Sequence, residues 1–430
     1  MAPTRAQRAA KRRRDPEDQD QDTQTHKPQR RTTYHKSLKE PPIQGKSRKQ
    51  AIEDTSNISP TPSSRPSIAN DTLGNTLVDN IDSYNPIDFW RKEGRWPSQL
   101  FEPGMERLLA RKRSNSVSSE TLSGWKPREE KSTPYRDPRY KALLETKGCF
   151  MDEDDQGITE ESYTTHSTML NSKQTIPAES LFQDNLFKQT CRMVEDRNEA
   201  RVIRDITPLI VPSAEVLATY GATTLKCLIE SVDEGWNNSI PLTGTRPQPD
   251  YSVGFRREAF TKEQLEKLSP FIGDFITGDL SFFMATYYMY FPFLACEVTC
   301  GAAGLNVADR QNAHSMTIAA RAIVELFRLA KRENEVNRQI LAFSISHDYC
   351  SVRIYGYYPV IDGEDTKYYR HPIHKFDFTA LNGKDKWTAY QFTKNIYDTW
   401  MPDHFKRICS AIDQLPDFDV QELPQSTGLS

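Results

Sequence analysis

Hydrophobic positions change their period along the chain, and the changes predict where helices and strands lie. Over residues 181–210 apolar residues recur among charges at helical spacing, which predicts helices. Ser213 then stands where a helix N-cap is expected. The spacing of apolar residues predicts a further helix over 225–236, and residues 262–268 also have a helical pattern. The first half of the folded region is therefore expected to be helical.

After residue 249 the pattern becomes that of strands. Residues 251–255 alternate, and residues 291–300 form a β-branched and aromatic run of strand length. Two more strand-like runs, 340–346 and 351–356, are separated by four residues, which predicts a hairpin. The second half is thus expected to build a sheet.

Two long helices are expected among and after these strands. The clearest covers 309–332, with one apolar face and with Arg321, Glu325 and Arg328 pairing on the outer face. Residues 387–412 predict a closing helix, or a pair broken at its proline. Strands, a long helix and further strands favour the α/β class, with α+β as the alternative, and a mixed sheet flanked by helices.

Composition divides the chain into four segments. Residues 1–83 are polar and basic with few large apolar residues, so they are expected to be a disordered tail. Residues 84–132 are expected to be a linker with an aromatic anchor, 133–415 the globular domain, and 416–430 a C-terminal tail. The aromatic residues of the anchor are Phe89, Trp90 and Trp96.

The charge is uneven, which bears on partners. The net charge is -3, but residues 1–50 hold 14 Lys/Arg and 6 Asp/Glu, so the remainder carries about -11. This balance counts against strong non-specific DNA binding by the folded part. Within the tail, the cluster Lys11, Arg12, Arg13 and Arg14 fits the acidic groove of a nuclear import receptor. A solvated charge run and a contact to nucleic acid are the alternatives.

The seven cysteines and the apolar runs indicate the compartment. The cysteines are odd in number and scattered, and the N-terminus lacks the apolar core of a secretory signal, so an intracellular, reducing environment is expected. With the basic cluster, this predicts the nucleus, with the cytoplasm as the alternative. The longest apolar run, 281–305, is interrupted by tyrosines, Pro292 and Glu297, which predicts core rather than membrane.

Two acidic residues are the main candidates for chemistry. Because side chains alternate along a strand, Glu297 and Thr299 share one face of the run 291–300. Asp250, at the start of the preceding strand, could place a second carboxylate beside Glu297. Carboxylates on adjacent strands suit Mg²⁺ or Mn²⁺. The alternative is a structural Glu297 that pairs with a base such as Arg310 or Arg321.

Several motifs resemble a known family. The chain is similar over roughly residues 84–415 to a fungal domain of unknown function, which looks like a divergent member of the PD-(D/E)xK, or restriction-endonuclease-like, nucleases. The motifs that carry the resemblance are Arg246–Phe255, Ala308–Met316, Leu341–His347 and Phe405–Ile412.

This resemblance implies roles for particular residues. Asp250 and Glu297 match the metal-binding acids, and Gln311 stands where some such nucleases place a substrate-contacting glutamine. Thr299 takes the place of the family's lysine, and Ser315 takes the place of a tyrosine that often follows the glutamine. The resemblance thus implies a restriction-endonuclease-like core with one catalytic position changed.

The change at Thr299 decides the functional expectation. A lysine there would orient water and stabilise charge on the phosphate, and losing such a group costs orders of magnitude in rate. The expectation is a nuclear, nucleic-acid-related protein with a degenerate nuclease-like site. The alternatives are an active Mg-dependent DNA endonuclease, with Arg310 or Lys226 replacing the lysine, and a non-catalytic protein–protein adaptor.

Overall fold

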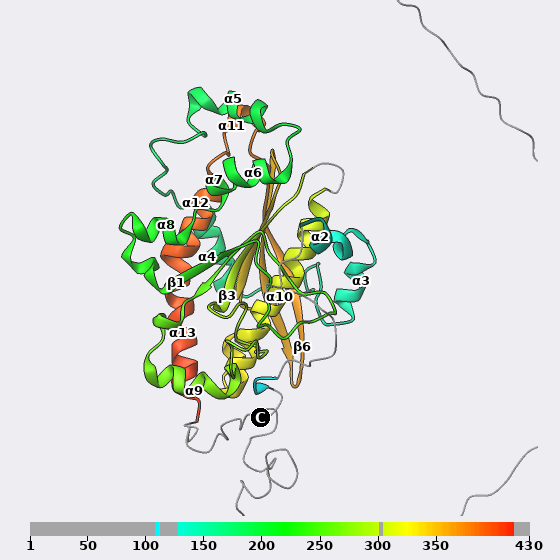
Figure 1. Ribbon diagram of the computed structural model, residues 1–430, viewed down its shortest axis with the longest axis vertical. Coiled ribbons are helices and arrows are strands. Elements are labelled where there is room, and N and C mark those ends of the chain that lie inside the picture. Colours follow the sequence, from blue (N-terminus) through cyan, green and yellow to red (C-terminus); the bar gives the residue numbers. More distant parts are fainter. Residues whose placement is uncertain (1–107, 112–127, 301–303, 417–430) are drawn as a thin grey trace, which may run out of the picture. The chain divides into compact units, whose positions relative to one another are not determined.

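The computed structural model of the protein describes residues 108–111, 128–300 and 304–416 (Figure 1). The basic cluster at residues 11–14 and the aromatic anchor at residues 89–96 lie outside the described residues.

Within the described residues, a mixed sheet of six strands forms the centre of the fold, and its strands follow one another in chain order. The parallel pair is β3 and β4, whereas every other neighbouring pair is antiparallel. The expected α/β class with a mixed sheet is therefore confirmed. The strands are β1 (Leu228–Val232), β2 (Tyr251–Phe255), β3 (Tyr290–Val298), β4 (Ala342–His347), β5 (Ser351–Asp362) and β6 (Asp365–Asp377).

Helices precede the sheet, cross between its parallel strands and close the chain. The N-terminal group is α2 (Arg128–Arg136), α3 (Tyr140–Glu145), α4 (Glu160–Asn171), α5 (Asp184–Val194), α6 (Glu199–Asp205), α7 (Thr207–Ile210) and α8 (Ala214–Thr219). The later helices are α9 (Lys262–Ile272), α10 (Leu305–Leu329), α11 (Ala380–Gly383), α12 (Thr388–Asn395) and α13 (Met401–Asp413). Short 3-10 turns are η3 (Thr223–Cys227), η4 (Arg257–Ala259) and η6 (Glu333–Glu335).

The sheet is covered on both faces (Figure 1). On one face, Ala295 of β3 belongs to a buried cluster with Val307 and Met316 of α10. On the other face, Phe343 of β4 packs edge-on against Phe392 of α12, with ring centroids 5.9 Å apart. The sheet is thus the middle layer of three, and α10 is the crossover that makes β3 and β4 parallel.

The expected helix over 225–236 is wrong. The segment holds the 3-10 turn η3 and then β1, which pairs with β2 from Leu228 opposite Phe255 to Val232 opposite Tyr251. Apolar residues at the first and fifth positions of a five-residue edge strand have a spacing that also fits a helix, and the pairing partner decides the outcome.

The long crossover helix is present, but its expected outer face is wrong in part. Glu325 and Arg328 do form an ion pair, at 3.6 Å, yet both are largely covered. Arg321 is half-buried over the ring of Phe282, 4.7 Å from its centroid, and donates a hydrogen bond to the Ile240 carbonyl. The segment between β2 and β3 therefore covers a helix face that the sequence pattern assigns to solvent.

Several other expectations are confirmed. The Ser213 side chain caps α8 by accepting from the Val216 N–H, and the helical pattern over 262–268 is part of α9, which begins with a capping box. The closing segment is a pair, α12 and α13, joined by the π-helical η7 (Ile396–Trp400), and Pro402 lies in the first turn of α13.

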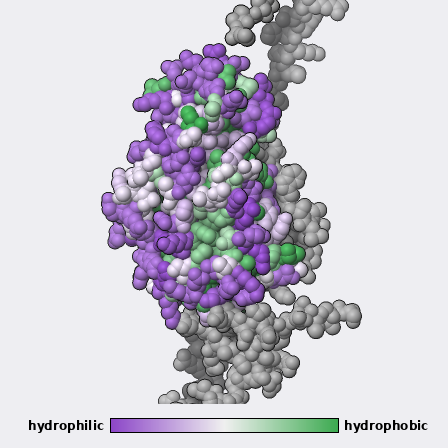
Figure 2. Space-filling view, turned by 90° about the vertical axis from the view of Figure 1, so that its left-hand side faces the viewer, coloured by the Kyte–Doolittle hydropathy of each residue, from purple (hydrophilic) through white to green (hydrophobic). Residues whose placement is uncertain are grey.

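No helix in the described ranges is long and apolar enough to cross a membrane. Figure 2 shows one face of the molecule, largely hydrophilic with hydrophobic residues gathered near its middle. The run 281–305 contributes β3 and much of the core, as expected. All seven cysteines are free thiols.

Candidate functional site

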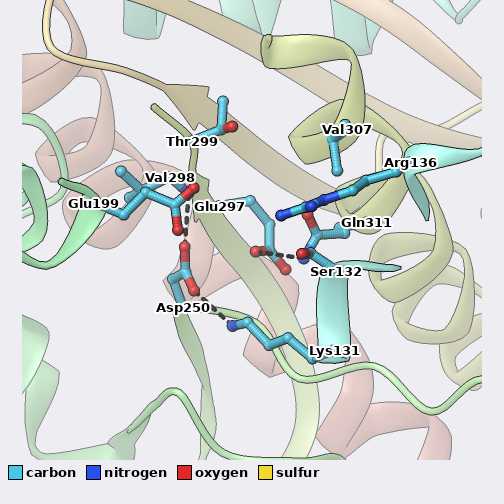
Figure 3. Close-up of a pocket in the computed structure, with 10 residues that line it drawn as sticks. All are labelled: Lys131, Ser132, Arg136, Glu199, Asp250, Glu297, Val298, Thr299, Val307 and Gln311. Carbon is cyan, nitrogen blue, oxygen red and sulfur yellow. Dashed lines mark hydrogen bonds and ion pairs between the residues drawn. The ribbon is translucent and has the colours of Figure 1, made fainter. Parts of the chain in front are cut away.

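A polar pocket lies at the end of β3, between the sheet, α2, α6 and the beginning of α10 (Figure 3). It brings together all four residues that the sequence predicts for the site, and it adds basic and acidic residues from the helices before the sheet. The lining residues are Lys131, Ser132, Arg136, Glu199, Asp250, Glu297, Val298, Thr299, Val307 and Gln311.

Strand pairing places the two predicted acids side by side. Tyr251 lies opposite Cys296 in the antiparallel pair of β2 and β3, so Asp250, one residue earlier, falls opposite Glu297. The Val298 N–H donates to Asp250 Oδ2 at 2.7 Å, which holds this carboxylate against the end of β3. Asp250 is 3% exposed and Glu297 is 2% exposed. Burial of two carboxylates together is costly unless a cation compensates them.

The compensating cation is Lys131, which reaches the acids from α2. Its Nζ donates to Asp250 Oδ1 at 2.6 Å, to Asp233 Oδ1 at 2.8 Å and to the Gln248 carbonyl at 2.8 Å. Figure 3 shows the side chain extending from α2 toward Asp250. Lys131 is only 6% exposed, so this ammonium is held by protein atoms.

Packing of α2 on α10 fixes the position of this lysine. One turn after Lys131, the Tyr135 hydroxyl pairs with His314 Nδ1 at 2.9 Å. The Tyr135 carbonyl accepts from Arg310 Nε at 2.6 Å. Because Tyr135 and Lys131 are four residues apart, they lie on the same face of α2, and docking one of them positions the other.

The electrostatics keep Lys131 charged. Burial alone lowers the pKa of this ammonium, but the charges of Asp250 and Glu297 and hydrogen bonds to Asp233 and Asp250 outweigh burial, and the net effect is a raised pKa. The residue is therefore a fixed positive charge at neutral pH and cannot act as a general base.

Gln311 and Thr299 also line the pocket, whereas Ser315 does not. Gln311 Nε2 donates to Glu297 Oε2 at 3.1 Å, which orients the carboxylate from the second turn of α10. Thr299 follows the last residue of β3, and its N–H donates to the His347 carbonyl at 3.1 Å. Ser315 is buried one turn beyond Gln311 and donates to its carbonyl at 3.1 Å. Thr299 thus lines the pocket but brings no charge.

Glu199 adds a third carboxylate that the sequence pattern did not single out. It lies in the first turn of α6, which Asn198 caps, and its Oε1 accepts from the Cys300 N–H at 3.3 Å. Figure 3 shows its side chain directed to the same space as that of Asp250. The acid is 51 residues before Asp250 in the chain, so only the fold reveals the proximity.

Sequence reasoning missed Lys131, the basic residue that contacts Asp250 in the pocket. Lys131 belongs to the segment 84–132 that composition assigns to a linker, and it stands in a short polar helix without a distinctive motif. The two bases proposed from sequence do not line the pocket: Lys226 lies in the exposed turn η3, and Arg310 is engaged with α2.

The donor set of the pocket fits a hard divalent cation with water in its coordination shell. Asp250 and Glu297 offer carboxylate oxygens from adjacent strands, and Mg²⁺ commonly uses one or two carboxylates and keeps several waters. In the described ranges, no three His, Cys, Asp or Glu side chains group closely enough to form a complete protein cage. A metal at Asp250 would either share the Oδ1 atom with the Lys131 ammonium or displace the ammonium toward Asp233. Lys131 already donates a hydrogen bond to Asp233.

Comparison with known proteins identifies the domain that contains most of this pocket. A family described as a domain of unknown function (DUF7924) matches residues 186–412, just over half of the chain. The chain belongs to the DUF7924 family. No curated protein matches the chain.

The DUF7924 match confirms the expected resemblance to a domain of unknown function, over a shorter range than the 84–415 expected. It includes Glu199, Asp250, Glu297 and Gln311, but it begins after Lys131. In this chain, a helix before the matched DUF7924 region therefore completes the pocket.

Proposed function

We propose that the pocket is a divalent-metal-dependent phosphodiesterase site of the PD-(D/E)xK kind, in which Lys131 takes the role expected of a lysine at position 299. One observation carries the proposal: the Lys131 Nζ lies 2.6 Å from Asp250 Oδ1, in the pocket that also contains Glu297 and Gln311. The missing charge at Thr299 is the reason to expect a degenerate site, and Lys131 supplies a charge to the same pocket from another element.

The protein's own groups have distinct parts in this proposal. The Lys131 ammonium stabilises negative charge that builds on the phosphoryl oxygens, because it is a fixed cation in a largely enclosed site. Gln311 orients the Glu297 carboxylate through its side-chain amide. Asp250, held by the Val298 N–H, keeps its carboxylate directed to the same space.

A metal ion would be held by Asp250 and Glu297. Bound there, Mg²⁺ or Mn²⁺ supplies Lewis-acid polarisation of the phosphate and lowers the pKa of coordinated water. The substrate of such a site is a phosphodiester, and the mixed sheet with two acids on adjacent strands supports the restriction-endonuclease-like hypothesis.

The test is DNA cleavage by the purified full chain with Mg²⁺ or Mn²⁺. The wild type is expected to cleave, Glu297→Gln to be inactive, and Lys131→Gln to be about 10²- to 10³-fold slower, the usual cost of removing one such electrostatic group. In the Lys131→Gln chain, an added Thr299→Lys substitution is expected to restore part of the rate. The same Thr299→Lys substitution alone is the matched control.

Titration of Mn²⁺ by calorimetry separates the outcomes. Cleavage that Glu297→Gln leaves unchanged would overturn the proposed site. Metal uptake without cleavage by the wild type, followed by cleavage in Thr299→Lys, would establish a degenerate enzyme and refute the role given to Lys131.

A second candidate is a non-catalytic nucleic-acid-binding or adaptor domain, in which Lys131 permanently replaces a metal. It is favoured by the three hydrogen bonds of the Lys131 ammonium, which satisfy all of its protons. This candidate predicts no Mn²⁺ uptake by the wild type. Nuclear import through residues 11–14 belongs to both candidates and is tested by the location of a fluorescent fusion with those residues changed to glutamine.

A further inference from the structure

Several cationic side chains lie around the first turns of α10, beside the acidic residues of the pocket. Arg353 donates to Asp309 Oδ2 at 2.6 Å, and Arg370 lies 3.9 Å from the same oxygen. Arg310 adjoins Asp309 in sequence, and Lys375 lies opposite Arg353 in the pairing of β5 with β6. We call this group the α10 basic band, and its members are Arg136, Arg310, Arg353, Arg370 and Lys375.

The register of the sheet gives the band a direction. Glu297 of β3, Ser346 of β4, Arg353 of β5 and Lys375 of β6 are successive partners across the sheet. Paired residues point to the same face, so this row runs from the acids of the pocket to the cations of the band. With strands about 4.8 Å apart, Arg353 and Lys375 start about 10 and 14 Å from Glu297.

The far end of the band is accessible. Lys375 is exposed, and the Arg353 side chain is 30% exposed. Both Arg370 and Lys375 lie over the Tyr355 ring, at 4.0 and 5.4 Å from its centroid, which holds their charges together.

The near end of the band reaches the pocket itself. Arg136 is exposed and lines the pocket. Arg310 donates a hydrogen bond to the carbonyl of Tyr135, the residue before Arg136 in the chain. Asp309 and Asp137 offset part of the charge of the band. Five cations against these two acids still leave a positive stripe on a folded part whose overall charge is negative.

We propose that the α10 basic band binds the phosphates that flank the bond at Asp250 and Glu297, so that a nucleic-acid strand runs from the pocket across the beginning of α10 to β6. This inference rests on the proposed phosphodiesterase function, because it names the polymer that the site takes. A lone phosphodiester needs no cations 10–14 Å away, whereas a polyanion gains from each of them.

The test measures binding of short labelled oligonucleotides, single-stranded and double-stranded, to the full chain in EDTA, where no cleavage occurs. The double variant Arg136→Gln/Lys375→Gln removes two exposed cations of the band, and Lys262→Gln/Lys188→Gln removes two exposed lysines of α9 and α5 as the matched control. Both pairs are also made in a chain with residues 11–14 changed to glutamine, which removes the contribution of that cluster.

The band variant is expected to bind several-fold more weakly than the control, and its slope of log affinity against log salt should fall by about 1.4 to 1.8, from two lost phosphate contacts. Binding equal to that of the control variant would overturn the inference. Hydrolysis of a small phosphodiester such as bis(p-nitrophenyl) phosphate, with no binding of oligonucleotides, would also overturn it while leaving the proposed function in place. A lower salt slope in the band variant, without cleavage of any phosphodiester by the wild type, would support binding of nucleic acid by the band and would contradict the proposed phosphodiesterase function.

Discussion

Removing the Lys131 ammonium is the perturbation whose effect the structure constrains most closely. Lys131→Met keeps a long apolar stem but deletes the charge and its three hydrogen bonds. Asp250 is then left buried with its neighbour Glu297 and without the cation that touches it.

The size of the effect follows from burial. Lys131 is 6% exposed and Asp250 is 3% exposed, so water cannot replace the lost partner. Breaking a buried pair in this way typically costs about 3–5 kcal/mol of the free energy of unfolding. For a domain of this size, that corresponds to a fall in the melting temperature on the order of 10 °C.

The assay is urea unfolding of the full chain, with and without Mn²⁺, compared with the variant Lys386→Met. Lys386 is also buried and also ion-paired, but the side chain of its partner, Asp184, is 97% exposed, so deleting it should cost no more than about 1 kcal/mol. Saturating Mn²⁺ should restore stability to Lys131→Met, by about 2.7 kcal/mol at a hundred times the dissociation constant, because the metal replaces the ammonium beside Asp250.

Two results would refute this reasoning. Equal stability of Lys131→Met and Lys386→Met would mean that the buried pair carries no special energy. A loss of stability that Mn²⁺ leaves unchanged would mean that Asp250 and Glu297 do not hold a metal even when the competing cation is gone.

Three further changes test other parts of the structure. Gly254→Ala, at the irregularity between β2 and β3, would place a methyl 2.6 Å from a side chain and 2.8 Å from a backbone carbonyl, so it should lower the free energy of unfolding by about 1–3 kcal/mol, whereas Gly244→Ala meets nothing and should be neutral. Thr261→Ala removes the capping box of α9 and should cost about 1 kcal/mol in urea unfolding, and a neutral result would contradict the cap. Burial, aided by a nearby arginine, lowers the pKa of His314 to about 3, so its contribution to stability is complete above pH 6.5 and is lost as the pH falls toward 3. Between pH 7 and 5 the wild type should therefore lose about 2 kcal/mol more than His314→Gln, and equal losses would disprove the shift.

Local pattern predicted the parts of the site that strand geometry controls. A run of β-branched and aromatic residues predicted β3, and the alternation of side chains predicted that Glu297 and Thr299 face the same pocket. Asp250 follows the same logic, since the residue before a paired strand continues its register. Gln311 was found because the long helix after the strand was clear from its period.

Other features depend on contacts between distant segments, and no local pattern encodes them. The strand β1 has five residues, and its apolar spacing fits either period until β2 pairs with it. Arg321 looks like a solvent-facing helix residue until the loop with Phe282 covers it. Glu199 reaches the pocket only because α6 stacks beside the end of β3.

The position of Lys131 shows why a single changed residue is weak grounds for judging a site. Electrostatic stabilisation depends on where a charge lies relative to the reacting atoms, not on which strand or helix carries it. Thr299, directly after β3, stands where the resemblance implies a lysine, and Lys131, from 119 residues before Asp250 in the chain, places an ammonium 2.6 Å from the Asp250 carboxylate. A helix before the matched DUF7924 region can therefore decide whether the pocket is charged, and a fragment limited to residues 186–412 should lack that charge altogether.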